Sequence, residues 1–385
     1  MKIAIVAVGY NRPDSMRRLI KSLLNANYYN YKVDLIFSID KGEKQDQIIE
    51  VAEECLWKHG EKHIRAFSEK QGLRKHILQC GSLTEIYDAI VVLEDDLIVS
   101  NFFFKYVVEA LKFYRNEDEI AGISLYTHQT HPGVRRPFEA VNNGYDTFLM
   151  QFAMSWGQCW TKKMWKEFRN WYSKNENSDL GRDGYIPSYI AKWNQQSWLK
   201  YYMRYIVETK KYFVYPYVAL STNASDIGEH CSIPNNDYQI ALLQGDKEYK
   251  FPSIGDAIKY DIFFERIGIE EKVFPELKGS KILDLYGSRN EYGKYDYIVS
   301  TRRLPYEIVG EYSLKYRPIE MNCMFPSIGN GIYVYNSKKR TRGLASRNED
   351  ILTRYEVRAI HWKRLLRLGF RGLNDAIYSR LKRVK

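Results

Sequence analysis

The decisive stretch of the sequence reads Ala89-Ile90-Val91-Val92-Leu93-Glu94-Asp95-Asp96, in which five apolar residues run directly into three carboxylates. A continuous apolar run of this kind is typical of a strand buried on both faces of a parallel sheet. The three carboxylates, called the acidic triplet below, repel one another, so placing them at a buried strand end is costly unless a cation lies beside them. Oxygen ligands suit Mg²⁺ or Mn²⁺. The stretch therefore predicts a divalent-cation site, with a solvated acidic turn as the alternative.

Apolar runs alternate with helix-like segments on both sides of this stretch. The predicted strands are residues 3–8, 33–39, 63–67, 89–93 and 121–126. The predicted helices begin near residue 13 and cover 45–59, 72–82 and 102–114. This alternation predicts an α/β fold with a doubly wound, mostly parallel sheet flanked by helices.

Polar residues follow three of the predicted strands. These residues are Asn11, Asp40 and Asp96. In open α/β sheets, ligands bind outside the carboxyl ends of the strands. We therefore expect the three side chains to lie along one edge of the sheet although they are far apart in the sequence.

The positive charge is concentrated in one segment. The net charge is +11, and residues 354–385 contribute +8 of it through ten Lys or Arg and two Asp or Glu. The remainder is nearly neutral, so no nucleic-acid partner is expected.

Cysteines and apolar runs bear on the cellular compartment. The five cysteines are widely spaced and form no CxxC or Cys/His cluster, which favours reduced thiols in a cytoplasmic protein. No apolar run of about 18 residues is present, and the first strand-like run lacks the features of a signal peptide.

Residues 91–103 carry a resemblance to a known family. The segment Val91-Val92-Leu93-Glu94-Asp95-Asp96-Leu97-Ile98-Val99-Ser100-Asn101-Phe102-Phe103 resembles the metal-binding segment of GT-A-fold transferases related to the Golgi N-acetylglucosaminyltransferase that acts on the mannose core of N-glycans. Gly9-Tyr10-Asn11-Arg12-Pro13 resembles their first donor loop, and Phe37-Ser38-Ile39-Asp40 resembles the acidic strand end that contacts the base. The likeness covers roughly residues 1–230 and extends to bacterial family 2-like glycosyltransferases, which lack a Golgi anchor.

The resemblance implies an inverting hexosyl- or N-acetylhexosaminyltransferase that uses Mn²⁺ or Mg²⁺. Its donor would be a nucleotide sugar, UDP-linked, and its acceptor a glycan or lipid-linked saccharide in surface polysaccharide assembly. Asp96 would bind the metal directly, while Glu94 and Asp95 would contact the ribose and the surroundings of the ion. Asp40 would read the uracil edge. Asn11, Arg12 and Arg74 would line the nucleotide and its phosphates.

The chain divides into three predicted parts. Residues 1–250 form a GT-A catalytic domain, with a donor and metal half at 1–128 and an acceptor half at 129–250. Residues 251–350 form a smaller α/β unit that contains the strand-like runs 281–286 and 297–300. Residues 351–385 form a basic amphipathic tail.

The catalytic base stays open among several residues. An inverting transferase needs a carboxylate or His to take the acceptor proton. The resembled family places an Asp shortly before a Trp in a late helix, whereas the local match, Trp193-Asn194-Gln195-Gln196-Ser197-Trp198, has no carboxylate. Gln196 occupies that position, and Asp226, Glu229 and His230 are the alternatives in a polar loop.

Aromatic and glycine residues are candidates for the sugar subsites. Trp156 and Gly157 belong to a segment that packs beside the donor sugar in the resembled family, and Trp193 and Trp198 bracket Gln196. The alternative for each Trp is a place in the core.

Residues 354–385 interleave apolar residues with Lys and Arg at helical spacing. Such a helix can lie on anionic lipid, which would place the protein on the inner face of the cell membrane; the alternative is a helix packed on the body.

Two other functions compete with a transferase. A sugar nucleotidyltransferase would carry a glycine-rich phosphate loop, but Gly9-Tyr10-Asn11-Arg12-Pro13-Asp14-Ser15 has one glycine. A non-catalytic module that binds nucleotide sugars or glycans is the other, because no carboxylate lies between Trp193 and Trp198.

Overall fold

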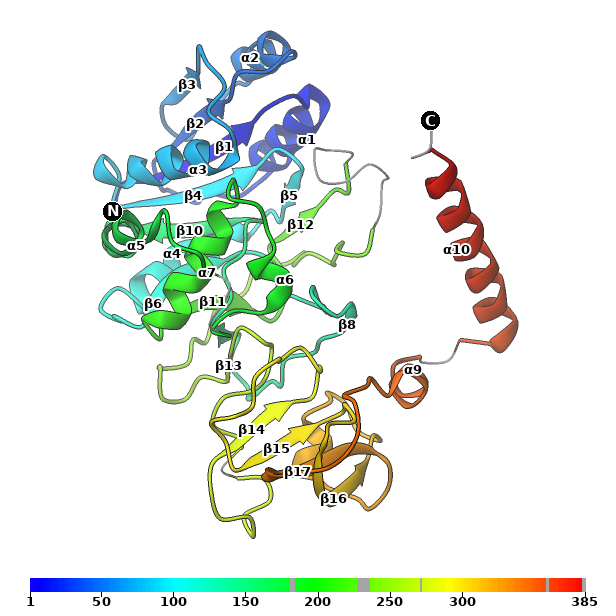
Figure 1. The fold of residues 1–385 in the computed structure, drawn as a ribbon. Coiled ribbons are helices and arrows are strands. Elements are labelled where there is room, and N and C mark those ends of the chain that lie inside the picture. The colour runs from blue at the N-terminus through cyan, green and yellow to red at the C-terminus, as the bar shows by residue number, and fades with distance from the viewer. Residues whose placement is uncertain (181–183, 227–235, 271, 358–359, 383–385) are drawn as a thin grey trace.

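A computed structural model of the chain describes residues 1–180, 184–226, 236–270, 272–357 and 360–382 (Figure 1). Its centre is a sheet of nine strands. In spatial order these are β13 (Lys259–Tyr260), β9 (Thr147–Met150), β11 (Tyr212–Pro216), β6 (Ile120–Ser124), β10 (Gln158–Thr161), β4 (Ala89–Glu94), β1 (Ile3–Gly9), β2 (Val33–Ile39) and β3 (Lys62–Ala66). The predicted α/β class with a mostly parallel, helix-flanked sheet is confirmed.

Strand β1 shows why the sheet is buried on both faces. Successive side chains of a strand point to opposite faces. Ala4, Val6 and Val8 belong to one hydrophobic cluster, whereas Ile3, Ile5 and Ala7 belong to the other. A strand in this environment must be apolar at every position, which is the pattern that identified it in the sequence.

Different helices supply most of the helical side chains in the two clusters. One cluster takes side chains from α1 (Pro13–Leu24), α2 (Gln45–Glu54) and α4 (Phe103–Phe113). The other takes them from α3 (Leu73–Gly81), α5 (Lys162–Asn175) and α7 (Trp198–Glu208). Shorter elements connect them, namely η1 (Ser82–Glu85), β5 (Leu97–Val99), β7 (Thr130–His131), β8 (Arg136–Pro137), α6 (Ser188–Ala191) and β12 (Ser221–Asn223).

The sheet departs from a purely parallel one at its centre. Strand β10 pairs antiparallel with both β4 and β6, and β9 pairs antiparallel with β11. The pairs among β3, β2, β1 and β4 are parallel, as predicted. The four residues of β10 are too few for a periodic signal, so the sequence predicts only a segment that precedes a helix.

A second sheet lies below the first in Figure 1. Its strands in spatial order are β14 (Lys281–Asp284), β15 (Tyr297–Ser300), β17 (Gly331–Arg340) and β16 (Tyr306–Ser313), and the helices α8 (Met321–Met324) and α9 (Glu349–Glu356) accompany it. Leu283, Val299 and Val334 from this sheet belong to the same hydrophobic cluster as α5 and α7. One face of the smaller sheet is therefore continuous with the main core.

The chain then passes into α10 (Trp362–Lys382), which stands apart from the body in Figure 1. No helix in the described part of the chain is both long and apolar enough to cross a membrane.

Candidate active site at the carboxyl edge of the large sheet

The carboxyl ends of β4, β1 and β2 lie next to one another. Val8 of β1 pairs with Glu94 of β4 on one side and with Ser38 of β2 on the other. Parallel pairing at this level brings the loop after β1, Asp40 after β2 and the acidic triplet after β4 to the same edge. The polar segments that follow these three strands in the sequence therefore lie together in one candidate site.

The loop after β1 leads directly into α1. Arg12 is the N-cap residue of α1, and Pro13 occupies the first helical turn, where its missing N–H is tolerated. The positive end of the helix dipole therefore points toward the edge that carries the acidic triplet. Helix N-termini of this kind favour anionic groups such as phosphates.

Arg12 is the main positive partner of the acidic triplet. Its guanidinium donates to Asp95, and its Nη1 lies 3.2 Å from Oδ2 of Asp96. Asp95 is buried, whereas the Asp96 side chain keeps 14% of its exposure. The site is thus covered on the Asp95 side and open to a ligand at Asp96.

The acidic triplet has more negative charge than Arg12 balances. The pKa of Glu94 is raised to about 8, mainly by burial and then by the charges of Asp96 and Asp95, against the opposing effect of Arg12. Burial likewise raises the pKa of Asp95 to about 6, although Arg12 lowers it. A second cation at this edge would relieve both shifts.

Two carboxylate oxygens show where such a cation fits. Oδ2 of Asp95 and Oδ1 of Asp96 are buried and have no hydrogen-bond partner among the described residues. Buried polar atoms nearly always have a partner, so an unpaired pair of oxygens needs an explanation. These are hard anionic ligands, which is the donor set that Mg²⁺ or Mn²⁺ requires.

A different group of residues would meet the spacing of a three-ligand metal site. Within the described ranges, only Asp34, Glu61 and His63 bring three ligand atoms within 4.8 Å of one another. They lie at the amino ends of β2 and β3, the edge opposite the acidic triplet. Oδ1 of Asp34 already accepts the Glu61 N–H at 2.9 Å. This group provides an internal control for metal binding away from the candidate site.

Asp40 is buried and bonded to the backbone. Its Oδ1 accepts from the N–H groups of Lys41 (2.8 Å) and Gln71 (2.7 Å), and its Oδ2 accepts from Gly72 N–H (2.9 Å). Asp40 thereby fixes the loop that precedes α3. Asn11 does the same for the neighbouring loop, because its Oδ1 accepts the N–H of Lys44 at 3.1 Å.

Asp226 lies against the first turns of α1. Ser15 Oγ donates to its carboxylate at 2.6 Å, and Arg18 donates to the same oxygen. Burial alone would raise the pKa of Asp226, but the bonds from Arg18 and Ser15 hold it below its ordinary value. An ion-paired carboxylate of this kind is a poor proton acceptor, so Asp226 fits a positioning role better than the predicted base. The other two base candidates, Glu229 and His230, lie outside the described residues.

Arg74 is not at the acidic triplet. Its guanidinium donates to the Tyr172 hydroxyl at 2.6 Å and to the backbone oxygens of Gln195 (3.0 Å) and Glu176 (2.9 Å). All three nitrogens are used in joining α3 to α5 and to the loop before α7. Gln196 in that loop is exposed and lies beside Gly72, near the loop that Asp40 holds.

The segment before β10 lies beside Glu94, as its register with β4 requires. Trp156 is half-buried, and its ring lies 4.9 Å from that of Tyr126 and 5.1 Å from that of Tyr238. Gly157 has a φ of +91°, and a Cβ there would come within 2.9 Å of Ser221 Oγ. The chain therefore needs glycine at this position.

Trp193 and Trp198 differ in their surroundings. Trp198 is 1% exposed and packs edge-on against Trp160 in the core, so the prediction of a sugar contact is replaced by a core role. It opens α7, whose N-cap Ser197 accepts from Lys200 N–H. Trp193 is half-buried on the outside of the same core.

Three residues of the site were missed by the sequence patterns. Ser15 and Arg18 bind Asp226 one helical turn into α1, and Ser155 opposes the raised pKa of Glu94 through a hydrogen bond. Helical spacing of Ser15 and Arg18 after the loop that follows β1 would have placed them on one face, but nothing in the sequence pairs that face with residue 226.

No family model and no curated protein matches the chain. Among solved structures, a fragment of TarS from S. aureus in complex with UDP-GlcNAc is 13% identical over 60% of this chain and 60% of that chain, with a TM-score of 0.38. The chain spans 37% of a longer TarS structure. The mannosyltransferase PcManGT from Pyrobaculum calidifontis, in complex with GDP-Man and Mn²⁺, is 9% identical over 45% and 46%, with a TM-score of 0.29.

A cytidylyltransferase from Leptospira borgpetersenii is also similar, at 12% identity over 44% of this chain and 64% of that chain, with a TM-score of 0.26. Identities and scores of this size show no family. The function therefore has to be inferred from the site itself.

Proposed function

We propose that the protein is a metal-dependent, inverting glycosyltransferase that moves a hexosyl or N-acetylhexosaminyl group from a UDP-linked donor to a glycan or lipid-linked saccharide in surface polysaccharide assembly. The observation that carries this proposal is the unpaired pair of buried oxygens on Asp95 and Asp96 at the carboxyl edge of the sheet. The same edge carries Arg12 and the amino end of α1. Opposite charges are thus arranged for a cation and a diphosphate side by side.

Each residue at this edge has a distinct part in the proposal. Asp96, the more exposed of the two aspartates, would hold Mn²⁺ or Mg²⁺, and the bound ion would act as a Lewis acid on the leaving diphosphate. Arg12 supplies fixed positive charge beside the phosphates. Asp226 fixes the first turns of α1, and Trp156 offers an aromatic face on the side of Glu94.

Binding of UDP with and without metal tests the proposal. Calorimetry on the intact protein should show UDP binding that requires Mn²⁺, and Asp96→Ala should abolish it while the melting temperature stays unchanged. The matched control is His63→Ala, which alters the metal-like group at the opposite edge and should leave UDP binding intact. Undiminished metal-dependent UDP binding in Asp96→Ala would reject the assignment.

Hydrolysis of a panel of nucleotide sugars separates the competing functions. Slow, Mn²⁺-dependent release of UDP from one donor supports a transferase. Binding without release would identify a non-catalytic module, and formation of a nucleotide sugar from a nucleoside triphosphate and a sugar phosphate would identify a nucleotidyltransferase.

A further inference from the structure

Helix α10 has two chemically different faces. At 3.6 residues per turn, Trp362, Leu365, Leu366, Phe370 and Leu373 fall within an arc of about 140°. The opposite side of the helix carries Arg364, Arg367 and Arg371. Between Trp362 and Leu373, Leu368 is the apolar residue that falls outside the arc. This separation is that of an amphipathic helix with a basic polar face.

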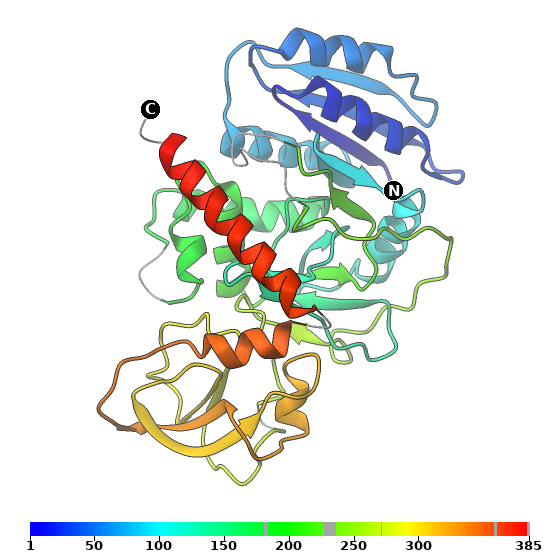
Figure 2. The ribbon, with the colours of Figure 1, turned by 90° about the vertical axis from the view of Figure 1, so that its right-hand side faces the viewer.

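The apolar face of α10 is not covered by the body. Every described side chain from His361 to Asn374 is exposed, and Leu366, Phe370 and Leu373 keep at least 53% of their exposure. The two views agree, because α10 is separated from the body in Figure 1 and lies in front of it in Figure 2. Large apolar side chains gathered on one exposed face mark a surface for interaction.

The preceding helix, α9, behaves in the opposite way. Glu349 and Glu356 both pair with the buried guanidinium of Arg136, at 2.9 Å and 2.8 Å, and Leu352 is buried. Arg317 donates to the backbone oxygens of Tyr355 and Glu356. Helix α9 therefore belongs to the body, and the exposed segment is described from Ile360 onward. This boundary is later than the one expected from the charge pattern.

We propose that α10 binds the surface of an anionic lipid bilayer, with its apolar face in the headgroup region and its arginines beside the lipid phosphates. Charge complementarity selects this occupant: no carboxylate among the side chains that the structure describes pairs with the three arginines, and an anionic surface supplies the missing charge. The helix is about 32 Å long, so its whole face can lie along the surface. It cannot cross the bilayer.

The position of α10 relates membrane binding to the candidate active site. It lies on the side of the body where β5 and β12 lie, and these strands directly follow the acidic triplet and precede Asp226 in the chain (Figures 1 and 2). A membrane bound there would face the candidate active site. This step rests on the proposed function, because it identifies the acceptor as a saccharide linked to a membrane lipid.

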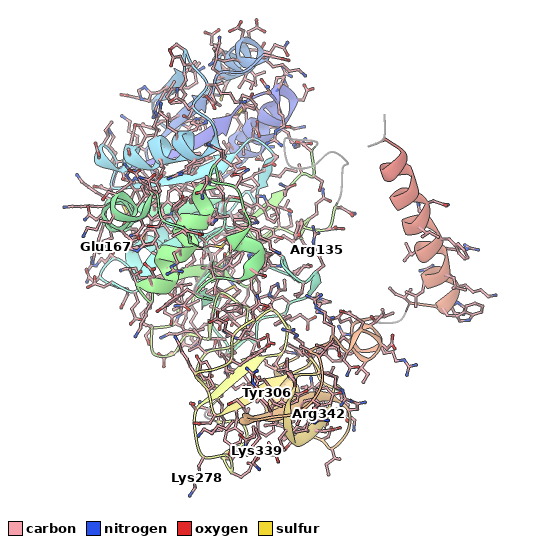
Figure 3. The ribbon with its side chains drawn as sticks, viewed as in Figure 1. Arg135, Glu167, Lys278, Tyr306, Lys339 and Arg342 are labelled. Carbon is pink, nitrogen blue, oxygen red and sulfur yellow. The ribbon has the colours of Figure 1, made fainter. Side chains whose placement is uncertain are left out.

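Vesicle co-sedimentation of the full chain tests the proposal. The probe is a set of phosphatidylcholine vesicles with and without about 30 mol% phosphatidylglycerol, in about 50 to 500 mM NaCl. Each arginine near an anionic surface contributes roughly fivefold to the partition constant, so we expect Arg364→Gln/Arg367→Gln/Arg371→Gln to weaken binding at least tenfold. The charge-matched control is Lys278→Gln/Lys339→Gln/Arg342→Gln, at exposed positions before β14, within β17 and after β17 (Figure 3), which should bind like the parent.

A second measurement separates insertion from charge attraction. Trp362 should be quenched by brominated lipid, and the quenching should fall in Trp362→Phe. At low salt, the control variant should still bind anionic vesicles. The apolar-face variant, Leu366→Ser/Phe370→Ser/Leu373→Ser, should not bind them. A chain of residues 1–357 should not bind vesicles, should melt at the temperature of the full chain, and should still hydrolyse a soluble donor.

Several results would overturn the proposal. The first is that the full chain does not sediment with anionic vesicles at low salt, and the second is that the control variant weakens binding as much as the arginine variant does. The third is a lower melting temperature of residues 1–357, which would indicate that α10 packs on the body. The fourth is a dimer that forms without lipid and dissociates in the apolar-face variant. Binding to RNA in preference to vesicles would also overturn it. Donor hydrolysis is measured separately in solution, so failure of the membrane proposal and failure of the proposed function give different results.

Discussion

Two groups of buried and half-buried carboxylates differ in how many of their oxygens have hydrogen-bond partners. The acidic triplet ends β4, and the second group, the junction carboxylates Asp261, Glu265, Asp284 and Glu320, lies where the smaller sheet meets the large one. Burial raises the pKa of Glu94 and Asp95 in the first group, and it raises the pKa of Glu265, Asp284 and Glu320 in the second. The acidic triplet leaves two buried oxygens unpaired, whereas no oxygen of the junction carboxylates is both buried and unpaired.

The contacts of Asp284 show how the second group is satisfied. Its Oδ2 accepts from Tyr292 Oη at 2.5 Å and Ser300 Oγ at 3.2 Å, and its Oδ1 accepts from Arg289 N–H at 3.0 Å. Arg289 in turn pairs with Asp261. A buried network whose polar atoms all have hydrogen-bond partners stabilises one packing arrangement, whereas unpaired buried oxygens are available to bind a ligand. The difference in pairing, and not the number of carboxylates, therefore distinguishes a site from a structural joint.

The largest effect is expected from a substitution in the acidic triplet. Asp96→Asn keeps the size of the side chain but removes the charge that a cation needs, so we expect Mn²⁺-dependent donor hydrolysis to fall at least about a hundredfold. Stability should not decrease, because one of three repelling carboxylates has become neutral. Steady-state hydrolysis and urea unfolding measure the two quantities. A loss of stability with normal hydrolysis would make the acidic triplet a structural joint instead.

The reciprocal change is made in the satisfied group. Asp284→Asn places an amide where three donors converge, so at least one of them loses its acceptor, and we expect a loss of about 2–4 kcal/mol in the free energy of unfolding. UDP affinity should be unchanged. Chemical denaturation and calorimetry on the same preparation check this, and a fall in UDP affinity at normal stability would contradict the comparison.

A smaller effect concerns pH. Burial is the main reason why the pKa of Glu320 rises from 4.5 to about 7, against the opposing effects of Arg266 and of Tyr260, whose hydroxyl donates to Oε1 at 2.9 Å. Because the folded pKa lies above the unfolded one, folding favours the protonated form; this contribution is complete below about pH 4.5 and is lost as pH rises through about 7.

Glu320→Gln removes this titration and keeps a carbonyl acceptor for Tyr260. The variant should match the parent in stability at pH 5 and exceed it by at most about 3 kcal/mol at pH 8, since one pKa unit corresponds to about 1.4 kcal/mol. Denaturation curves across this range test the sign. A variant that is less stable than the parent at pH 8 would show that the ionised carboxylate is stabilising.

The sequence predicts the fold of residues 1–128 well and the rest poorly, for a physical reason. Strands β1, β2 and β4 are buried on both faces, so their apolar runs are unbroken and their polar ends are conspicuous. Strand β10 is as buried as they are, but its four residues are paired by contacts distant in sequence. Local pattern does not encode such pairing.

The side-chain roles also divide into those that local sequence indicates and those that depend on contacts distant in the sequence. The acidic triplet was predicted because carboxylates at the end of an apolar strand violate local expectation. The pairing of Arg74 with Tyr172 and of Asp226 with Arg18 joins residues far apart in the chain, and no motif spans them. The core position of Trp198 is likewise set by Trp160 and not by its neighbours in sequence.

The smallest expected effect sharpens the comparison, because Asp40 belongs to neither group. It is satisfied by three backbone N–H groups, as a structural carboxylate is, yet it lies at the edge that carries the acidic triplet. If one of its lone pairs also accepts the N3 proton of uracil, Asp40→Ala should lower UDP affinity by about 1–3 kcal/mol. The same change releases the loop before α3, so the melting temperature should fall as well.

Asp40→Asn separates the two roles of Asp40. The amide keeps one oxygen for the loop, so most of the stability should return, while its NH₂ group replaces one of the two acceptors. Calorimetry with UDP and with CDP is then decisive, since cytosine has no N3 proton and presents an acceptor there. Asp40→Asn that regains stability but shifts preference from UDP toward CDP supports base recognition by Asp40. Recovery of UDP affinity in step with stability would show that Asp40 acts only by holding the loop. A carboxylate whose oxygens all have protein partners would then be structural in this case too, as it is among the junction carboxylates.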